Sequence, residues 1–325
     1  MATARSLVPT IDISGSADDI DAQLDALDAA CRDHGFFLLA GHGLDDVIAE
    51  TWDAARAFFD SGRGNKQSVE RDLDNPLGWN DRELTKRKRD HKEVFDLIDP
   101  SFAPVDARNR WPAEPAAFRD TLAAFYDAFS ELSERTVDLV HRALGMDPSD
   151  EHGRRFAGDR INSAVRLNHY TLGDPVPADE RSDLADLGET ALGDHTDPGV
   201  LTLLLQDDAG GLQAQSRNGD WIDVEPVPGT VVVNLADSVQ VWTNDRYRAA
   251  VHRVLPMTAT DRISIPYFLH PTRDAVVEPI TELIGSDEPR YRSFEWRQFM
   301  RARTDDNFAD LGADDTQISD YLISN

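Results

Sequence analysis

The chain has 325 residues, of which 40% are hydrophobic, enough to build a sizeable core. Its 33 lysines and arginines stand against 60 aspartates and glutamates, so the formal net charge is −27. Because no long basic cluster offsets this charge, we expect neither a nucleic-acid nor a membrane partner. An acidic surface can attract cationic substrates, but a well-solvated surface is the simpler explanation, so the charge does not indicate a function.

The chain contains one cysteine, Cys31. It can form neither an intramolecular disulfide nor a cysteine-based zinc or iron–sulfur site, and a reducing cytoplasm is the expected location. Cys31 shares an apolar helix face with Leu24 and Leu27, which predicts a core residue rather than a nucleophile. We find no apolar run of signal-peptide length at the N-terminus and none of membrane-spanning length elsewhere.

The N-terminal part of the chain predicts alternating strands and helices. Residues 8–13 alternate in polarity like a short strand, and Ser16 is a suitable N-cap for a helix that includes residues 20–31. Residues 36–40 predict a buried strand, and residues 45–59 predict a second helix. None of these segments carries visible chemistry.

Residues 62–92 are polar and rich in Gly, Asn, Asp, Lys and Arg, which predicts a long loop or flap outside the core. The basic run at residues 86–89 lies inside this segment. In so acidic a chain, we expect this run to form a solvated or salt-bridged surface rather than a binding patch.

The clearest helix begins near Pro115 and ends at Gly145. Spacings of four and three residues place an apolar stripe on one of its faces, formed by Phe118, Leu122, Phe125, Phe129 and Leu132. Such a stripe could line a pocket, but it is more typical of a scaffold helix packed on a sheet.

From about residue 163 the chain predicts short strands separated by turns, typical of an all-β sandwich or barrel. Asn218-Gly219 is a strong hairpin signal, because both residues tolerate positive φ. The predicted strands are residues 211–215, 221–224, 230–235 and 262–269, and the tail returns to helix at 294–303 and 315–322.

His195 and Asp197 form the first candidate site. If the segment is extended, side chains two residues apart point to the same face, so the imidazole and the carboxylate converge as a chelating pair. This spacing also arises by chance in a chain rich in aspartate, so a third ligand is needed to decide between the two explanations.

His252 supplies that third ligand from a β-like run in the same strand-rich half of the chain. Two histidines and one carboxylate on one face of a metal leave its other positions open, as non-haem iron(II) enzymes require. Zinc enzymes can use similar ligands, so the triad predicts a metal site without fixing the reaction.

Arg262 and Ser264 also share one face of a predicted strand, ten residues after His252. A guanidinium can bind a carboxylate through paired hydrogen bonds, and the serine hydroxyl adds a third. The pattern predicts a carboxylate anchored near the metal. The alternative is that Arg262 merely pairs with a neighbouring acidic side chain.

This ordered set of residues resembles the isopenicillin N synthase-like branch of the 2-oxoglutarate and iron(II)-dependent oxygenases. The resemblance spans residues 8–280 and keeps the family order, which is more specific than any single motif. Gly41 stands where family members often carry asparagine, a departure that we do not expect to affect the chemistry. The matching segments are Val8-Pro9-x-Ile11-Asp12, His34-Gly35-Phe36-Phe37, Gly41-His42-Gly43, Asn168-x-Tyr170, His195-x-Asp197, His252 and Arg262-x-Ser264.

The resemblance implies an α+β fold, a double-stranded β-helix or jelly roll with an N-terminal α/β segment and flanking helices. The implied parts are an N-terminal scaffold in residues 1–160, an oxygenase core in residues 161–280 and C-terminal helices in residues 281–325, packed as one unit. The implied roles are iron(II) binding by His195, Asp197 and His252, binding of the distal 2-oxoglutarate carboxylate by Arg262 and Ser264, and assistance from Asn168 and Tyr170.

The implied activity is oxidation of a small organic molecule with 2-oxoglutarate and dioxygen, releasing succinate and carbon dioxide. Asp197 is a carboxylate rather than glycine or alanine, which disfavours halogenation and leaves hydroxylation, desaturation or ring formation. Phe268 either lines the substrate pocket or packs in the core. Substrate identity and oligomeric state are not predicted, but recognition is expected to involve residues 62–92, residues 174–192 and the C-terminal helices.

Two other functions stay open on the sequence alone. An oxidase of the same fold could use Arg262 and Ser264 for a substrate carboxylate and need no 2-oxoglutarate. A jelly-roll protein could also bind a metal or ligand without turnover. This second alternative is less favoured, because a structural metal site normally closes its coordination sphere with a fourth protein ligand.

Overall fold

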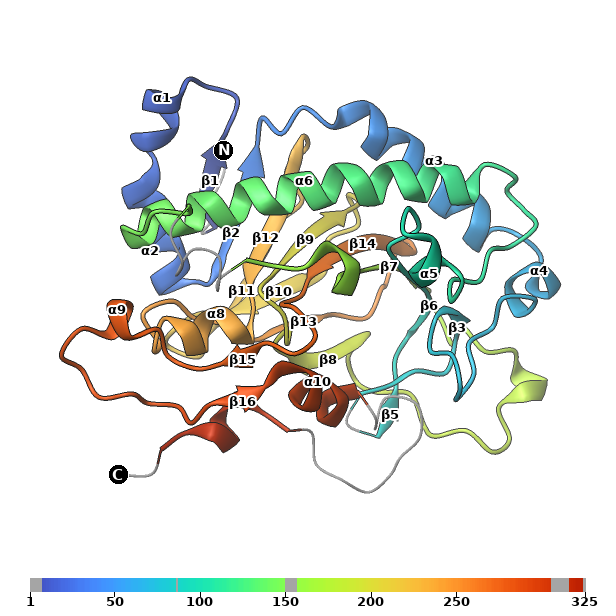
Figure 1. The fold of residues 1–325 in the computed structure, drawn as a ribbon. Coiled ribbons are helices and arrows are strands. Elements are labelled where there is room, and N and C mark those ends of the chain that lie inside the picture. The colour runs from blue at the N-terminus through green and yellow to red at the C-terminus, as the bar shows by residue number, and fades with distance from the viewer. Residues whose placement is uncertain (1–7, 86, 150–156, 305–315, 324–325) are drawn as a thin grey trace.

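The computed structural model describes residues 8–85, 87–149, 157–304 and 316–323 (Figure 1). Its main sheet has eight strands in the order β1-β2-β12-β9-β14-β7-β6-β3, and a second sheet has four in the order β11-β10-β13-β8. Only the β1–β2 pair is parallel among the described neighbours in these two sheets. The strands of the main sheet are β1 (Thr10–Asp12), β2 (Phe36–Ala40), β3 (Gly78–Asn80), β6 (Lys92–Ile98), β7 (Ala164–Tyr170), β9 (Leu201–Gln206), β12 (Thr230–Leu235) and β14 (Arg262–Leu269).

The second sheet and two small ribbons complete the strands. The second sheet contains β8 (Leu192–His195), β10 (Leu212–Gln215), β11 (Trp221–Asp223) and β13 (His252–Val254). The ribbons pair β4 (Leu84–Thr85) with β5 (Lys88–Arg89), and β15 (Val276–Val277) with β16 (Phe294–Glu295). The arrangement is α+β with a jelly-roll core.

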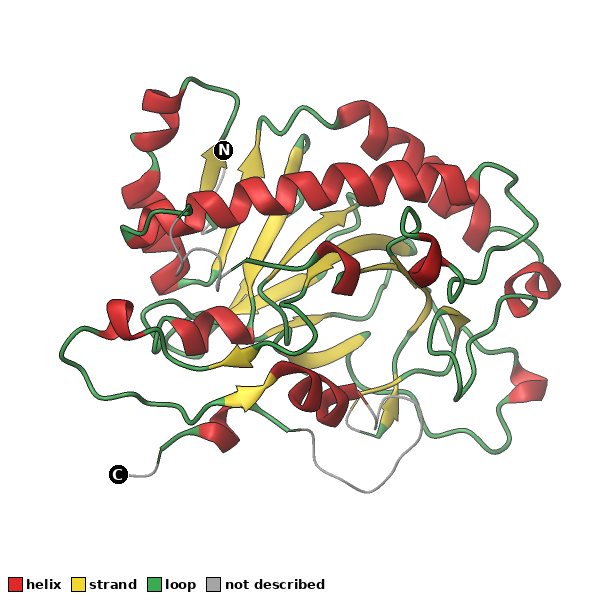
Figure 2. Cartoon of the chain, in the orientation of Figure 1, coloured by secondary structure: helices red, strands yellow, loops and turns green. Residues whose placement is uncertain are grey.

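Helices cover one face of the main sheet, and the long helix α6 runs across its strands (Figures 1 and 2). None of the described helices is both long and apolar enough to cross a membrane. The α-helices are α1 (Ala17–Asp21), α2 (Leu24–Asp33), α3 (Asp45–Phe59), α4 (Arg63–Gln67), α5 (Ala103–Asp106), α6 (Phe118–Leu144), α8 (Asp237–Trp242), α9 (Thr281–Ile284) and α10 (Trp296–Thr304).

Strand β14 shows how the main sheet separates core from cavity. Successive side chains of a strand point to opposite faces. On β14, Ile265, Tyr267 and Leu269 join the apolar core beneath the helices. The alternate residues, including Arg262 and Ser264, line a cavity on the other face. The packing of one face against the helices therefore fixes which side chains face the cavity.

Most predicted elements are confirmed, with shifted boundaries. Ser16 forms a capping box at the start of α1, but the predicted first helix is two helices, α1 and α2. The aromatic stripe of α6 is buried core, and the helix ends at Gly145, whose left-handed conformation has a φ of 79°. Cys31 is fully buried, and burial raises the pKa of its thiol, as expected of an inert core residue.

The prediction of a loop or flap at residues 62–92 is wrong. The segment contains α4, the ribbon β4–β5 and strand β3, which pairs with β6 at the edge of the main sheet. Trp79 of β3 is fully buried, and its indole N–H donates to Glu93 over 2.7 Å. The segment is polar because it contains buried ion pairs, such as Arg71 with Glu83 at 3.2 Å. Such pairing is invisible to a polarity pattern.

The basic run and the tail differ in part from expectation. Arg89 is paired with Asp174, as a salt-bridged run would be, but it is buried rather than on the surface. Lys86 and Asp315 lie outside the described residues. Helix α10 confirms the helix predicted in the tail, whereas Ile318–Tyr321 forms only a short 3₁₀ helix.

The aromatic cluster between α3, α6 and the sheet should be a main source of stability. Phe58 is fully buried, and its ring centroid lies 5.0 Å from that of Phe95 and 4.9 Å from that of Phe118. We expect Phe58→Ala to lower the free energy of unfolding in urea by about 3–5 kcal/mol, through lost burial and a residual cavity. The control Phe102→Ala, at a side chain that is 41% exposed, should change it by about 0.5 kcal/mol or less. Equal losses in both variants would contradict the predicted role of the cluster.

Candidate metal centre and cavity

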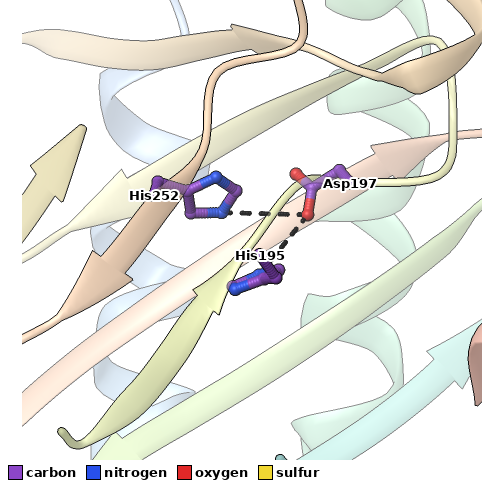
Figure 3. Close-up of side chains that lie close together, drawn as sticks. All are labelled: His195, Asp197 and His252. Atoms are coloured by element: carbon purple, nitrogen blue, oxygen red, sulfur yellow. Dashed lines mark ion pairs between the residues drawn. The ribbon is translucent and has the colours of Figure 1, made fainter. Parts of the chain in front are cut away.

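The second sheet brings His195, Asp197 and His252 together (Figure 3). His195 ends β8, His252 begins β13, and the two residues stand directly opposite each other in the antiparallel pairing of these strands. Asp197 follows two residues after His195. One potential ligand atom from each residue lies within 4.8 Å of the other two. This geometry could hold one metal ion, and the pairing explains how residues far apart in the sequence meet.

Both imidazoles direct the same nitrogen into the centre of this cluster. Nδ1 of His195 donates to the carbonyl of Gly193 over 2.8 Å, and Nδ1 of His252 donates to the carbonyl of Ala250 over 3.1 Å. A carbonyl only accepts, so Nδ1 carries a proton, and in the neutral imidazole the lone pair is then on Nε2. The two Nε2 atoms lie 3.7 and 3.8 Å from Oδ1 of Asp197. Figure 3 shows both rings turned toward that oxygen.

The carboxylate of Asp197 is held by neighbouring strands. Its Oδ2 accepts hydrogen bonds from the Thr202 hydroxyl on β9, at 2.5 Å, and from the Asn234 amide on β12, at 2.8 Å. These bonds fix the rotation of the carboxylate and leave Oδ1 facing the two imidazoles. Partners of this kind orient a metal ligand without touching the metal.

The protonation states suit metal binding. Desolvation, reinforced by the neighbouring His252, lowers the pKa of His195 below its ordinary value. Burial alone would raise the pKa of Asp197, but the two imidazoles and the hydrogen bonds from Thr202 and Asn234 together hold it below its ordinary value. At neutral pH, His195 is therefore neutral and Asp197 ionised, the forms that coordinate a metal.

Helix α10 is attached to the segment that carries Asp197. The Trp296 indole N–H donates to the carbonyl of Pro198 over 2.9 Å. The Arg303 guanidinium donates to the carbonyl of Thr196 over 2.5 Å. The residues on both sides of Asp197 are thus tied to the C-terminal helix, which also lines the cavity through Met300 and Arg303.

The cluster opens into a cavity of about 380 Å³ lined by both sheets, α10 and residues of the 71–85 segment. A site of this size suits a small organic molecule. Alternate residues of β7 and β14 line it, together with apolar side chains from several other elements. The lining residues from β7 and β14 are Ala164, Arg166, Asn168, Tyr170, Arg262, Ser264, Pro266 and Phe268.

Arg262 is a buried cation without a carboxylate partner among the described residues. It is 1% exposed, and its Nε and Nη1 find no hydrogen-bond acceptor there. Its Nη2 lies 3.5 Å from Oε1 of Gln206, and its guanidinium carbon lies 5.0 Å from the centre of the Tyr170 ring. An unpaired buried guanidinium is costly, so the site is built to receive an anion.

Ser264 and Asn168 stand beside this guanidinium. They are directly opposite each other across the β7–β14 pairing, and the Asn168 amide lies 3.5 Å from the Ser264 hydroxyl. Oδ1 of the buried Asn168 has no partner among the described residues. Arg262, Ser264, Asn168 and Tyr170 therefore form one polar corner of the cavity, which brings together the residues that the family resemblance grouped.

Family comparisons agree with this geometry. Residues 161–271 match the model of the 2OG-Fe(II) oxygenase superfamily, and residues 8–114 match that of the non-haem dioxygenase in morphine synthesis N-terminal region. Homoarginine-6-hydroxylase 2-ODD-233 of Oryza sativa subsp. japonica is 32% identical over 84% of this chain and 88% of its own. The chain belongs to the 2OG-Fe(II) oxygenase superfamily.

Other members of the superfamily show the breadth of its substrates. Gibberellin 20 oxidase 1 of Arabidopsis thaliana is 32% identical over 90% of this chain and 78% of its own. A full-length Neurospora crassa protein, crystallised in complex with alpha-KG and thymine, superposes with a TM-score of 0.75, at 25% identity, over 92% of this chain and 96% of the other. The protein is thus an enzyme, an iron(II)- and 2-oxoglutarate-dependent oxygenase that acts on a small organic molecule.

The residues present fit the cofactors of the superfamily. Three protein ligands with a directed lone pair each, and an open side toward the cavity, suit an iron(II) that must also bind other ligands. The unpaired Arg262 suits a carboxylate of 2-oxoglutarate. The three-ligand cluster and Arg262 line the same cavity, so a single keto acid could reach both.

Sequence reasoning identified the metal cluster and the polar corner but missed their supports. Thr202 and Asn234 carry no motif, because their role depends on the pairing of β9 and β12 around Asp197. Phe268 does line the cavity. Of the regions expected to contact substrate, residues 62–92 and α10 contribute lining side chains, whereas residues 174–192 contribute only Leu192.

Arg166 was also missed, although a signal was present. It precedes Asn168 by two positions on β7, so it shares the cavity face with Asn168 and Tyr170. Its guanidinium belongs to a charged cluster on one wall of the cavity. The other lining members of this cluster, defined here as the charged wall, are Arg71, Glu83, Lys92 and Asp96.

Thr202→Val should weaken metal binding without disturbing the fold. The change removes the hydroxyl that fixes Oδ2 of Asp197, and we expect the dissociation constant for anaerobic Fe(II) to rise about 10- to 100-fold. The control Thr230→Val removes a hydroxyl that donates to the backbone carbonyl of Val227 instead. Calorimetric titration of both variants tests this, and unchanged affinity in Thr202→Val would show that the hydroxyl is dispensable.

Glu83 should make the charged wall sensitive to acid. Burial alone would raise its pKa, but Arg166, Lys92 and Arg71 outweigh burial and hold the pKa well below its ordinary value. A lowered folded-state pKa adds stability above the unfolded value of about 4.3, and this stability is lost as the pH falls further. We expect Glu83→Gln to destabilise the protein at pH 7 by about 3–5 kcal/mol, because it leaves buried cations uncompensated.

Melting curves from pH 7 to pH 3 test this expectation. The loss of stability on acidification should be smaller in Glu83→Gln than in the wild type. The control Glu134→Gln, at an exposed position of α6, should follow the wild-type curve. A Glu83→Gln curve parallel to the wild type would contradict the assigned role of Glu83.

Proposed function

We propose that His195, Asp197 and His252 bind iron(II), and that Arg262 with Ser264 binds the distal carboxylate of 2-oxoglutarate. Asn168 and Tyr170 assist by completing the polar corner. The observation that carries this proposal is the buried, unpaired Arg262 guanidinium in the same cavity as a three-ligand cluster. If Arg262 paired with a neighbouring acidic side chain, its role would be structural, but no such ion pair is present among the described residues.

The chemistry follows from these roles. Bound iron(II) and 2-oxoglutarate supply an oxidant from dioxygen, with release of succinate and carbon dioxide and oxidation of a substrate C–H bond. The carbonyls of Gly193 and Ala250 keep the imidazoles in the metal-binding tautomer, while Thr202 and Asn234 keep Oδ1 of Asp197 toward the metal. Arg262 sets the position of the keto acid relative to the metal.

The prime substrate is a small molecule oxidised by hydroxylation, desaturation or ring formation. Two of the related proteins are named for homoarginine and gibberellin, and a third was crystallised with thymine. These compounds differ widely in size and polarity, so the shared metal and keto-acid sites do not decide between them. The side chains that line the rest of the cavity must make that choice.

Two further proposals concern the whole chain. We propose that residues 1–160, 161–280 and 281–325 form one structural unit, supported by strands β1, β2, β3 and β6, which extend the main sheet from the N-terminal part.

We also propose a cytoplasmic location, supported by the single buried cysteine.

An anaerobic titration of the iron(II)-loaded protein with 2-oxoglutarate tests the site. We expect a visible charge-transfer band from the chelated keto acid. In Arg262→Ala the apparent affinity should fall by about 2 kcal/mol or more, roughly 30-fold, because a buried charge-assisted contact is lost. The control Arg273→Ala, at an exposed position shortly after β14, should titrate like the wild type.

Each outcome separates the proposal from its rival. A band that weakens only in Arg262→Ala establishes the keto acid and its anchor. Iron(II) bound with no band in the wild type would contradict the 2-oxoglutarate site. It would favour an oxidase of the same fold that uses Arg262 and Ser264 for a substrate carboxylate.

A further inference from the structure

An arginine–aspartate pair faces the cavity from the charged wall. Arg166 on β7 and Asp96 on β6 are direct partners in the antiparallel pairing of these strands. The pair is bidentate: Nε of Arg166 lies 2.7 Å from Oδ1 of Asp96, and Nη2 lies 2.9 Å from Oδ2. Both side chains line the same cavity as the metal cluster.

Buried charges hold this pair in place from behind. Nη1 of Arg166 donates to Glu83 over 2.9 Å, and Arg71 lies 3.2 Å from Glu83 and 3.6 Å from Asp96. Lys92 lies 3.0 Å from Glu83 and 3.4 Å from Asp90, so it is compensated within the wall. Arg71, Glu83 and Lys92 are almost fully buried, whereas the Arg166 and Asp96 side chains are 24% and 14% exposed. The accessible part of the wall is therefore the Arg166–Asp96 pair.

The pair has capacity for a further ligand. A guanidinium has five N–H groups, and the hydrogen bonds recorded among the described residues use three of those on Arg166. Each carboxylate oxygen of Asp96 can accept more than the one hydrogen bond it receives from Arg166. A molecule in the cavity thus meets a cationic hydrogen-bond donor, Arg166, directly beside an anionic acceptor, Asp96. The wall contains three cations, Arg71, Lys92 and Arg166, and two anions, Glu83 and Asp96, and Asp90 beside Lys92 supplies a further carboxyl group. It therefore offers both signs of charge to the cavity.

The pair is separate from the polar corner proposed for 2-oxoglutarate. On β7, Tyr170 stands opposite Arg262, and Arg166 lies four residues earlier on the same face. At about 3.3 Å per residue this separation is roughly 13 Å along the strand. A five-carbon keto acid fixed between Arg262 and the metal does not extend to Arg166, which leaves the pair for the prime substrate.

We propose that Arg166 and Asp96 bind the prime substrate through a zwitterionic head group of the α-amino-acid type. Arg166 receives its carboxylate and Asp96 its ammonium group. The proposal rests on the proposed function, since it needs the metal and the keto acid elsewhere in the cavity. Apolar lining residues such as Leu77, Phe268 and Met300 then contact the rest of the molecule.

Desolvation favours this class over the alternatives. An apolar monocarboxylic acid could bind Arg166, but it would remove water from the remaining acceptor positions of Asp96 without supplying a donor for them, at a cost of about 1–3 kcal/mol. A neutral cyclic imide matches donor to acceptor, yet it replaces water around two charges with uncharged groups. Charge-assisted hydrogen bonds are roughly twice as strong as neutral ones, so a zwitterion compensates the pair best.

The test uses the anaerobic protein loaded with iron(II) and 2-oxoglutarate. Pools of the proteinogenic amino acids and of their homologues with one more side-chain carbon are titrated into this complex while the charge-transfer band is monitored. Each amino acid that shifts the band is compared with its decarboxylated amine and its deaminated acid. We expect at least one amino acid to shift the band, and each truncated analogue to bind at least about tenfold more weakly. Thymine and indole-3-acetic acid serve as a cyclic imide and an apolar monoacid, and a response to either of these alone, or to no amino acid, overturns the proposal.

Variants connect the binding to the pair. Arg166→Met and Asp96→Asn should each weaken amino-acid binding at least about tenfold, while the 2-oxoglutarate band forms at wild-type concentrations. Arg166→Lys keeps the charge but not the two-pronged geometry, so its affinity for the amino acid should lie between those of the wild type and Arg166→Met. If Arg166→Met folds poorly, Arg166→Lys should still bind the amino acid more weakly than the wild type. The control Arg119→Gln breaks an arginine–aspartate pair on the surface of α6. Undiminished amino-acid binding in Arg166→Met and Asp96→Asn overturns the proposal, whereas absence of the band in the wild type contradicts the proposed function instead.

Discussion

The pairing of β8 with β13 is the constraint on which the site depends. It sets His252 opposite His195, and the two backbone carbonyls that accept from their Nδ1 atoms turn both Nε2 atoms inward. Asp197 then needs only one fixed rotation to complete the cluster, and Thr202 and Asn234 supply it from the main sheet. The proposed metal centre therefore draws its residues and their supports from both sheets. A change in register at either sheet would separate its ligands.

The helices stabilise this arrangement from a distance. They pack on one face of the main sheet, where alternate residues of β7, β9, β12 and β14 form the core. Because strand side chains alternate, the same packing directs Asn168, Arg262 and Ser264 into the cavity. The buried, unpaired guanidinium of Arg262 costs stability that this core offsets. Helix α10 acts differently, since it is tied directly to the backbone beside Asp197.

Sequence alone predicted what depends on short spacing and chain order. Residues two apart on a strand share a face, which was enough to place His195 with Asp197 and Arg262 with Ser264. The family resemblance added Asn168 and Tyr170. The family order added the jelly roll and the cofactors. Thr202 and Asn234 escaped prediction because they meet Asp197 only through strand pairings. Residues 62–92 were misjudged because a polarity pattern treats a buried ion pair as solvent-exposed charge.

The charged wall is difficult to explain by stability. Buried ion pairs gain little over well-packed apolar residues, because the desolvation of each charge consumes most of the Coulombic attraction. The charged wall, formed by Arg71, Glu83, Lys92, Asp96 and Arg166, therefore stabilises this end of the sheet less than apolar packing would. The cost is reasonable if the wall has to present fixed charges to a ligand, since buried neighbours prevent Arg166 and Asp96 from turning away. One wall can thus select a head group while the metal centre, built from other strands, determines the chemistry.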